Sequence, residues 1–385
     1  MAKIPEIKQD ETLLDIDKAL EQEQQLEKPR HYLGMSQIGE PCHRKLFYSF
    51  RGCEKRTIQA SGIRAIQDGF AQEDIMAKRL KMLSYIELHT EDPANPNKQI
   101  GFMLLLDHFR GHADGMIKGI KQAPKTWHVW ENKAVNETKF KKLQKLIDEK
   151  GEKKALIEWD EIYHAQAQIY MHCSQTERHY LNVQTPGGRG YLSCRTEYNK
   201  QFAENIIEKA KSIIFDNWVV PAKLSDKREF YLCKWCEFSE ICHDGKIPLI
   251  NCKTCRYSKP IEHGQRQCLK KDIIIDENLM FLDNCEDHIY NPAVIPAKLI
   301  EQQADGCIYE TEIGFKFANT TLLGFPDVKD NLDGIYSSKD LFNDIKNVNN
   351  LSKGIAKVQD IFNGNMEPSA VRKWDKQLDE RLKDI

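Results

Sequence analysis

The sequence lacks both a long apolar run and a strong net charge. No segment approaches the roughly 20 consecutive apolar residues of a membrane-spanning helix. The N-terminus has no apolar core of the kind that a secretory signal needs, so we expect a cytoplasmic protein. The formal net charge is only −2. This excludes a uniformly basic protein that coats nucleic acid, but it permits local basic patches.

What is present is sufficient for a folded protein of more than one domain. The chain has 385 residues, of which 41% are hydrophobic, and this length is typical of two or three domains. It also has 12 cysteines. In a cytoplasmic protein these are metal ligands or buried thiols more often than disulfides.

The segment from Gly111 to Asn136 (GHADGMI, then KTWHVWENKAVN) carries the chemistry. It predicts two strands joined by a polar turn. Asp114 ends the first strand, and Glu131 and Lys133 share one face of the second because side chains alternate. Two neighbouring carboxylates repel unless a cation lies between them, and oxygen ligands suit Mg²⁺ or Mn²⁺. A cross-strand salt bridge is the alternative for this pattern.

A helix is predicted from Ile63 to Leu83. Its apolar stripe contains one carboxylate, Glu73, at the spacing of its neighbours; the stripe is Ile66, Phe70, Glu73, Ala77 and Leu80. A carboxylate on an apolar face must be paired or bound to metal, or else lie at the edge of the stripe and reach water.

A second helix is predicted from Asp160 to Cys173, with Gln166 directed inward and Tyr170 one turn later. A buried amide needs hydrogen-bond partners. The edge of an active site, a nucleic acid strand or a neighbouring backbone could each provide them. Between the two helices lies a lysine-rich helix, residues 139–154, which is either a solvated face or a surface for a phosphate backbone. The order of elements predicts a mixed α/β sheet flanked by helices.

Two cysteine clusters follow. In the first, Cys233 and Cys236 form a C-x2-C pair with Cys242 five residues further on, and Cys42 is the natural fourth ligand. Four thiolates suit an iron–sulfur cluster or zinc.

The second cluster indicates a zinc ribbon with a structural zinc ion, with His288 as a reserve ligand. Its four cysteines are Cys252, Cys255, Cys268 and Cys285. The expected organisation is therefore a flexible arm (1–30), an α/β domain closed by the first cluster (31–248), the zinc ribbon (249–290) and a small α+β accessory region (291–385).

Taken together, these features resemble the PD-(D/E)xK nuclease superfamily over roughly Gly34 to His243. The chain is most similar to the RecB-like branch, which includes the CRISPR-associated iron–sulfur exonucleases, the AddB nuclease domain and, close in type, phage recombination exonucleases. The resemblance rests on Glu73, Asp114, the Glu131-x-Lys133 strand, the Gln166/Tyr170 helix and the first cysteine cluster. It implies a restriction-endonuclease-like core.

The resemblance also implies roles for these residues. Asp114, Glu131 and the backbone carbonyl of Asn132 or Ala134 would bind Mg²⁺ or Mn²⁺. Glu73 would bind the metal directly or orient a metal-bound water, and Lys133 would activate the attacking water. Gln166, Tyr170 and Arg44 would contact DNA, and the first cysteine cluster would hold a [4Fe–4S] cluster. One departure is the missing histidine that many members carry beside Glu73, where Gln72 and Asp74 stand.

The expected function is a metal-dependent DNA nuclease, and more specifically an exonuclease that processes DNA ends for recombination, replication or repair. Its expected partners are DNA and a recombination or single-strand-binding protein. Two alternatives share the fold: a non-catalytic DNA-binding scaffold and a restriction-type endonuclease.

Overall fold

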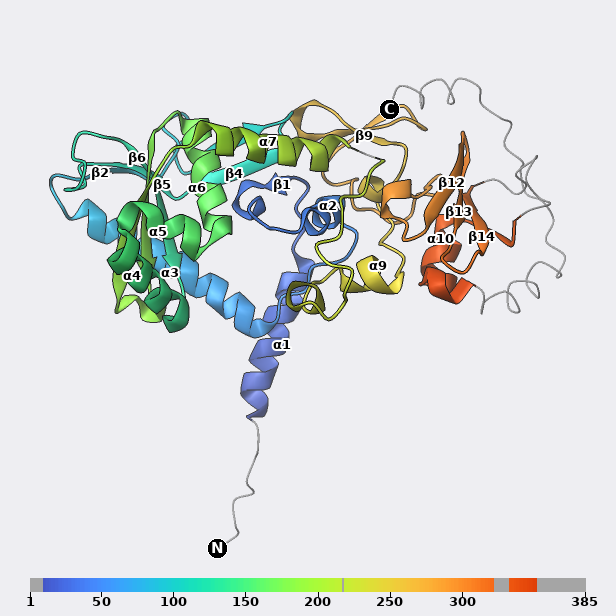
Figure 1. Ribbon diagram of the computed structural model, residues 1–385, viewed down its shortest axis with the longest axis horizontal. Helices are drawn as coiled ribbons and strands as arrows, with labels where there is room; N and C mark the ends of the chain where they lie inside the picture. The colour runs from blue at the N-terminus through green and yellow to red at the C-terminus, as the bar shows by residue number, and fades with distance from the viewer. Residues whose placement is uncertain (1–9, 217, 322–331, 352–385) are drawn as a thin grey trace, which may run out of the picture.

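The computed structural model describes residues 10–216, 218–321 and 332–351. It is a mixed α/β protein with several sheets (Figure 1). The end of the predicted accessory region, 352–385, lies outside the described residues. No helix in the described ranges is long and apolar enough to cross a membrane.

The largest sheet has five strands in the order β2-β5-β6-β7-β8. Strands β6 and β7 are parallel, and the other neighbours are antiparallel. This confirms the predicted strand pair. The strands are β2 (Glu87–His89), β5 (Gly115–Lys118), β6 (His128–Ala134), β7 (Arg178–Gln184) and β8 (Tyr191–Glu197).

Asp114 occupies the junction between two sheets. It lies between β4 (Phe109–Ala113) and β5. Strand β4 belongs to a three-stranded sheet with β1 (Leu33–Gly34) and β3 (Ile100–Leu104), whereas β5 belongs to the larger sheet. The prediction that Asp114 interrupts a strand is confirmed, and the interruption is the place where the chain changes sheets.

Helices cover the sheets as predicted, with one correction. The lysine-rich segment forms two helices, α4 (Glu137–Lys150) and α5 (Glu152–Trp159), because Gly151 adopts a φ of 83° and ends the first. Helix α6 (Glu161–Ser174) begins at Asp160, whose carboxylate accepts from the N–H groups of Ile162 and Tyr163. Helix α7 (Lys200–Phe215) packs beside α6.

The predicted apolar stripe of helix α3 (Ala60–Lys81) is only half correct. Leu80 is buried, but Ile66 is 43% exposed and Phe70 is 66% exposed. The buried positions include Gln72 and Met76 instead. Only the C-terminal half of α3 packs on the sheet, so the face that is buried is set by the neighbouring strands and not by the most apolar stripe.

The N-terminal helix α1 (Glu11–Leu26) extends away from the body and has no buried residue (Figure 1). It lies against the N-terminal half of α3, where Glu21 accepts from the N–H of Ala60 at 2.9 Å. Asp17 forms an ion pair with Arg64. The contacts are therefore polar and near the surface.

The two cysteine-rich segments form short elements. The first contains α8 (Tyr231–Lys234) and α9 (Ser239–Asp244), which lie near α2 (His43–Arg51). The second forms an antiparallel sheet of β9 (Ser258–Pro260), β10 (Arg266–Cys268) and β11 (Ile273–Ile275).

The C-terminal part is a four-stranded mixed sheet followed by a short helix. Its elements are β12 (Lys298–Gln303), β13 (Gly306–Glu310), β14 (Lys316–Thr320), β15 (Gly334–Tyr336) and α10 (Ser338–Asp340). A single apolar core contains Phe47, Phe238, Tyr290 and Phe317. The predicted accessory region therefore packs directly on the α/β domain.

Candidate active site

Asp114 and Glu131 come together at the centre of the site. Asp114 is 8% exposed and Glu131 is 3% exposed. The Oδ2 atom of Asp114 accepts a hydrogen bond from the backbone N–H of Asn132 at 2.8 Å. This bond joins the sheet junction to β6, and it fixes the Asp114 carboxylate beside the strand that carries Glu131 and Lys133.

The Glu131 carboxylate is held by two side chains through one of its oxygens. Lys133 donates from Nζ to Glu131 Oε1, as expected for two residues on one strand face. Gln166 donates from Nε2 to the same oxygen at 2.8 Å and contacts the Tyr170 hydroxyl at 3.4 Å. The buried amide predicted from the sequence thus finds its partner at the carboxylate.

Glu73 completes the set from the buried half of α3. It is half-buried. Burial, followed by the negative charge of Asp114, raises the pKa of Glu73 to about 7. Burial also raises the pKa of Glu131, and Asp114 adds to that shift. The three carboxylates therefore destabilise one another's charged forms, which is the electrostatic condition of an anionic site that a cation would relieve.

Lys133 has the opposite balance. Its burial alone would lower its pKa, but the charges of Glu131 and Asp114 outweigh that effect and raise the pKa above its usual value. Lys133 is therefore a protonated hydrogen-bond donor to Glu131. The single positive charge of Lys133 does not neutralise the three carboxylates.

Gln184 is a residue that sequence reasoning did not single out. Its Nε2 donates to the Gln72 carbonyl at 3.1 Å and to Asn132 Oδ1 at 2.9 Å. These bonds tie α3 to β6, and so they position Glu73 relative to Glu131. A polar residue at a buried strand position, next to the tight turn after β7, is the signal that could have indicated it.

The donor set fits a hard divalent cation. The second carboxylate oxygen of Glu131, Oε2, is buried and has no hydrogen-bond partner among the described residues. Asp and Glu oxygens are the ligands that Mg²⁺ and Mn²⁺ prefer. Within the described ranges, no three His, Cys, Asp or Glu side chains are already gathered around one point where an ion would sit. Side-chain rotation would therefore have to complete any metal site in this chain.

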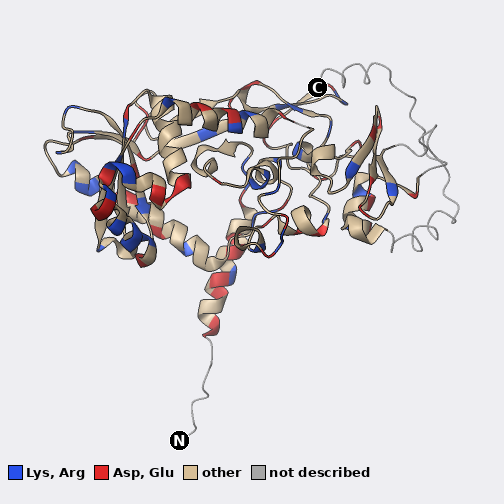
Figure 2. Cartoon of the chain, viewed as in Figure 1, with Lys and Arg blue, Asp and Glu red and all other residues tan. Residues whose placement is uncertain are grey.

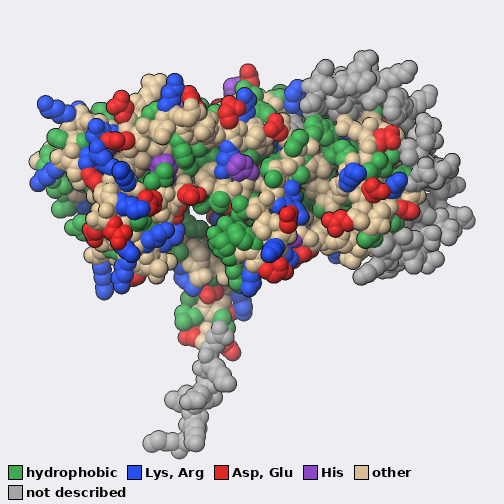
Figure 3. All heavy atoms as spheres, in the orientation of Figure 1, with side chains coloured by type: hydrophobic (Ala, Val, Ile, Leu, Met, Phe, Trp, Pro, Cys, Tyr) green, Lys and Arg blue, Asp and Glu red, His purple; other side chains and the backbone are tan. Residues whose placement is uncertain are grey.

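Basic side chains gather on α4 and α5 (Figure 2). Much of this charge is paired. Lys139 meets Asp160 at 3.0 Å and Lys145 meets Glu149 at 3.7 Å, and Lys150 is bonded to Glu158. Figure 3 shows the surface hollowed above the point where α1 leaves the body, with both charge signs around the hollow. Charge alone does not single out one DNA-binding face.

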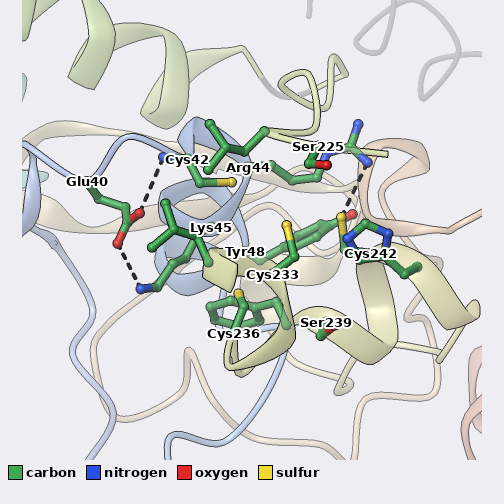
Figure 4. Close-up of a pocket in the computed structure, with 14 residues that line it drawn as sticks. Glu40, Cys42, Arg44, Lys45, Tyr48, Ser225, Cys233, Cys236, Ser239 and Cys242 are labelled. Atoms are coloured by element: carbon green, nitrogen blue, oxygen red, sulfur yellow. Dashed lines mark hydrogen bonds and ion pairs between the residues drawn. The ribbon is translucent and has the colours of Figure 1, made fainter. Parts of the chain in front are cut away.

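The four cysteines of the first cluster line one pocket, which also contains Glu40 and Lys45 (Figure 4). Cys42, at the start of α2, lines one cavity with Cys233, Cys236 and Cys242 from residues 233–242. The cavity has a volume of about 420 Å³, part of it open to solvent. Burial raises the pKa of Cys236 to about 11, and a hydrogen bond from the Phe238 backbone opposes this shift. Four thiols from two distant segments fit either metal that the spacing predicts.

Arg44, predicted to contact DNA, points to this cluster. Its Nε donates to the Pro221 carbonyl at 2.7 Å, and its Nη1 lies 3.8 Å from Cys242 Sγ. Contact with DNA stays a prediction for Arg44, and its observed bonds favour a role beside the thiols.

Comparison with known proteins gives only distant similarity. No protein-family model and no curated protein matches the chain. Among solved structures, SSO0001 is 17% identical over 61% of this chain and 98% of its own, with a TM-score of 0.35. The alkaline exonuclease LHK-Exo from Laribacter hongkongensis is 13% identical over 51% of this chain and 90% of its own, with a TM-score of 0.33. LHK-Exo in complex with dAMP is 14% identical over 48% and 86%, with a TM-score of 0.31. At these scores the matches do not assign the chain to a family.

Proposed function

We propose that the chain is a divalent-metal-dependent DNA nuclease that hydrolyses phosphodiester bonds. The observation that carries this proposal is the meeting of Glu73, Asp114 and Glu131, from three separate elements, beside the protonated Lys133. Carboxylates that raise one another's pKa are costly to keep together, and such groups concentrate at functional sites. The preference for DNA ends, and thus for exonuclease action, rests on the sequence resemblance.

The residues divide the work of a hydrolysis. Asp114, Glu131 and Glu73 would bind Mg²⁺ or Mn²⁺, with the backbone of Asn132 as a further ligand. When bound, such a cation lowers the pKa of a water molecule and offsets charge on the phosphoryl oxygens. Lys133 would orient the attacking water and stabilise the developing negative charge as a hydrogen-bond donor.

Gln166 and Tyr170 act through position. Gln166 holds one Glu131 oxygen, which leaves Oε2 of the same carboxylate for a cation. Tyr170 is 1% exposed, so it supports Gln166 from behind. A direct contact of Tyr170 with DNA would need a local opening.

The first cysteine cluster is proposed to hold a [4Fe–4S] cluster through Cys42, Cys233, Cys236 and Cys242, with zinc as the alternative. Its place is structural, since it joins α2 to the segment after α7. Iron analysis and visible absorption of anaerobically purified protein distinguish the two. A colourless protein with zinc in these thiols would remove the iron–sulfur assignment and leave the nuclease proposal intact.

The nuclease proposal is tested by digesting end-labelled linear and closed circular DNA with Mg²⁺ and with Mn²⁺. We expect cleavage of linear DNA by the wild type, none in EDTA, and a loss of at least about 100-fold in Lys133→Met. Lys125→Met, a lysine in the exposed turn before β6, is the matched control. Circular dichroism checks that both variants fold.

Other outcomes separate the alternatives. Discrete fragments from circular DNA would indicate a restriction-type endonuclease. DNA binding with no cleavage by folded wild type in either metal would support a scaffold on the same fold. Activity retained in Lys133→Met would overturn the proposed active site.

A further inference from the structure

The second cysteine cluster is built on backbone geometry that brings its first thiols together. Two residues separate Cys252 from Cys255, across the short helix η3 (Cys252–Thr254). The N–H of Cys255 donates to the Cys252 carbonyl at 3.3 Å, and the N–H of Cys252 donates to the Met280 carbonyl at 2.9 Å. The loop before β9 is therefore folded back on itself, with both thiols on one short turn.

The other two cysteines reach the same place from β10 and from the loop that follows β11. Cys268, at the end of β10, pairs in register with Ser258 and packs in one small core with Cys255. The side chain of Lys271 is hydrogen-bonded to Cys285. The thiols of Cys285 and Cys268 lie close enough to Cys252 to interact electrostatically with it. All four thiols thus share one neighbourhood, and side-chain rotation would bring them around a single ion.

His288, the reserve ligand, is engaged elsewhere. Its Nε2 lies 3.3 Å from Thr254 Oγ1 and 3.2 Å from the Asn251 carbonyl. A four-thiol set is therefore favoured over a set with three thiols and one imidazole.

A separate observation concerns buried positive charge beside these thiols. Arg266, on β10 two residues before Cys268, is 1% exposed. Its guanidinium donates to Ser258 Oγ at 2.7 Å and to the Ser258 carbonyl at 3.1 Å, and Nη1 has no hydrogen-bond partner. Lys253, between the first two cysteines, is fully buried, and its Nζ donates to the His31 carbonyl at 3.0 Å.

Arg266 has no carboxylate partner in the described part of the chain, where no ion pair includes it. A buried cation without a counter-charge is strongly unfavourable. Neutral thiols would not supply that counter-charge. Four thiolates around one Zn²⁺ carry two net negative charges, and so they would supply the counter-charge that Arg266 lacks. Lys253 is not part of this balance, because its Nζ is directed to the His31 carbonyl.

We propose that Cys252, Cys255, Cys268 and Cys285 bind one Zn²⁺ as a closed structural site, whose negative charge is balanced in part by the buried guanidinium of Arg266. The site has no free ligand position for substrate, since four protein thiolates complete a tetrahedral zinc. It stands independently of the nuclease proposal.

The position of the site, between the α/β domain and the C-terminal sheet, indicates a structural role. Toward the α/β domain, the His108 ring bonds the Ile261 carbonyl at 2.9 Å, and Gly264 N–H donates to the Leu106 carbonyl at 2.8 Å. Toward the C-terminal sheet, Arg256 Nη1 donates to the carbonyls of Gln303 and Gly306, each at 2.8 Å. The zinc would stiffen a segment that joins the two parts of the molecule.

The test is metal analysis of the full-length protein. We expect about one zinc per chain in the wild type. The double variant Cys268→Ser/Cys285→Ser should lose it, while Cys233→Ser/Cys236→Ser and the control Cys173→Ser, a thiol outside both clusters, should keep it. Replacing the zinc by Co²⁺ should give the visible bands of a tetrahedral thiolate complex. A zinc content that does not fall by about one ion per chain in the Cys268/Cys285 variant, iron at these thiols, or folded wild type without this zinc would each overturn the proposal.

The charge balance has its own test, which uses a chain with all four thiols intact. Arg266→Met should release zinc to a competing chelator about 10-fold more readily than wild type, since groups next to a metal site typically change affinity by this amount. Arg228→Met, an exposed arginine paired with Asp244, is the control. Equal zinc release from Arg266→Met and wild type would show that Arg266 does not balance the charge of the site. If Arg266→Met does not fold, the zinc content of the wild type still tests whether the site exists.

Discussion

At the scale of single residues, the carboxylates of the active site work against the stability of the fold. Glu73, Asp114 and Glu131 each have a raised pKa, and burial is the largest cause in every case. Such an arrangement persists where function requires it, and it implies a measurable cost in the absence of metal.

Glu73→Gln is expected to stabilise the metal-free protein at pH 8. The raised pKa means that the folded state binds the Glu73 proton more tightly than the unfolded state. The contribution of this proton to the free energy of unfolding is therefore full below about pH 4.5 and is lost as the pH rises through about 7. Removing the charge should raise the free energy of unfolding by about 1 kcal/mol at pH 8, after allowance for the partial exposure of Glu73. Denaturant unfolding in EDTA measures this.

Comparison at pH 5, where we expect little difference, gives the internal control. Asp74→Asn, the exposed next residue on α3, should have a clearly smaller effect. Adding Mg²⁺ should stabilise the wild type more than Glu73→Gln. An equal Mg²⁺ effect in both would contradict a metal contact for Glu73.

At the scale of elements, the site depends on how one helix is held against the sheet. Helix α3 has apolar residues along its whole length, but only its C-terminal half is covered by strands. The polar bridge through Gln184 connects it to β6, and Gly188 (φ 65°) lies so close to Gln72 that a Cβ there would come within 2.4 Å of Gln72 Oε1. A close, polar joint of this kind keeps Glu73 at a defined distance from the strand.

Gln184→Ala is expected to lower DNA cleavage by at least about 10-fold, because α3 loses its link to Asn132. It should also lower the free energy of unfolding by about 1–3 kcal/mol, since Asn132 Oδ1 would lose its partner in a buried place. Gln144→Ala, which removes an exposed contact to Asp148, is the control. Wild-type cleavage in Gln184→Ala would show that α3 needs no such link.

At the scale of the whole molecule, buried histidines make stability sensitive to acid. Burial lowers the pKa of His164 to about 4 and that of His179 to about 3. In the unfolded chain both titrate near 6.5. The stability that depends on these neutral histidines is thus present above about pH 6.5 and is lost as the pH falls toward 4. The reason is that the unfolded state binds protons that the folded state does not bind.

His164→Phe should make this loss shallower by about 1.4 kcal/mol per pH unit between pH 6 and 5, the contribution of one proton. The ring of Phe202, centred 4.8 Å from that of His164, gives the new side chain an apolar neighbour. Unfolding measured across pH 5–8, with the exposed His89→Asn as control, tests the slope. An unchanged slope would contradict proton uptake by His164.

If the proposed zinc stiffens the segment between the α/β domain and the C-terminal sheet, its removal should loosen that sheet as well as the ribbon. Removing its zinc should speed amide hydrogen exchange in β9–β11 and in β12–β14, since Arg256 and its neighbours connect these sheets. Strands β6 and β7 should keep their protection, because their pairing does not involve the ribbon. An equal increase of exchange in β6–β7 and in β9–β14, or no increase in either, would count against a local linking role.

Local sequence patterns correctly predicted how the side chains of the candidate active site are directed. Period-two alternation placed Glu131 and Lys133 on one face, and the spacing of Gln166 placed its amide inward, where it bonds Glu131. The C-x2-C pairs predicted two metal sites, because two intervening residues bring thiols onto one turn, and metal binding at both stays a prediction. These features depend on the geometry of a few neighbouring residues, which the sequence specifies directly.

Tertiary structure decided the rest. It selected Gln72 and Met76 over Ile66 and Phe70 for burial in α3, turned Arg44 toward the Cys242 thiol, and made Gln184 the link between α3 and β6. It also merged the predicted accessory region with the α/β domain into one core. The physical reason is that burial depends on which distant surface arrives opposite a residue, and the period of a helix or strand says only which residues share a face.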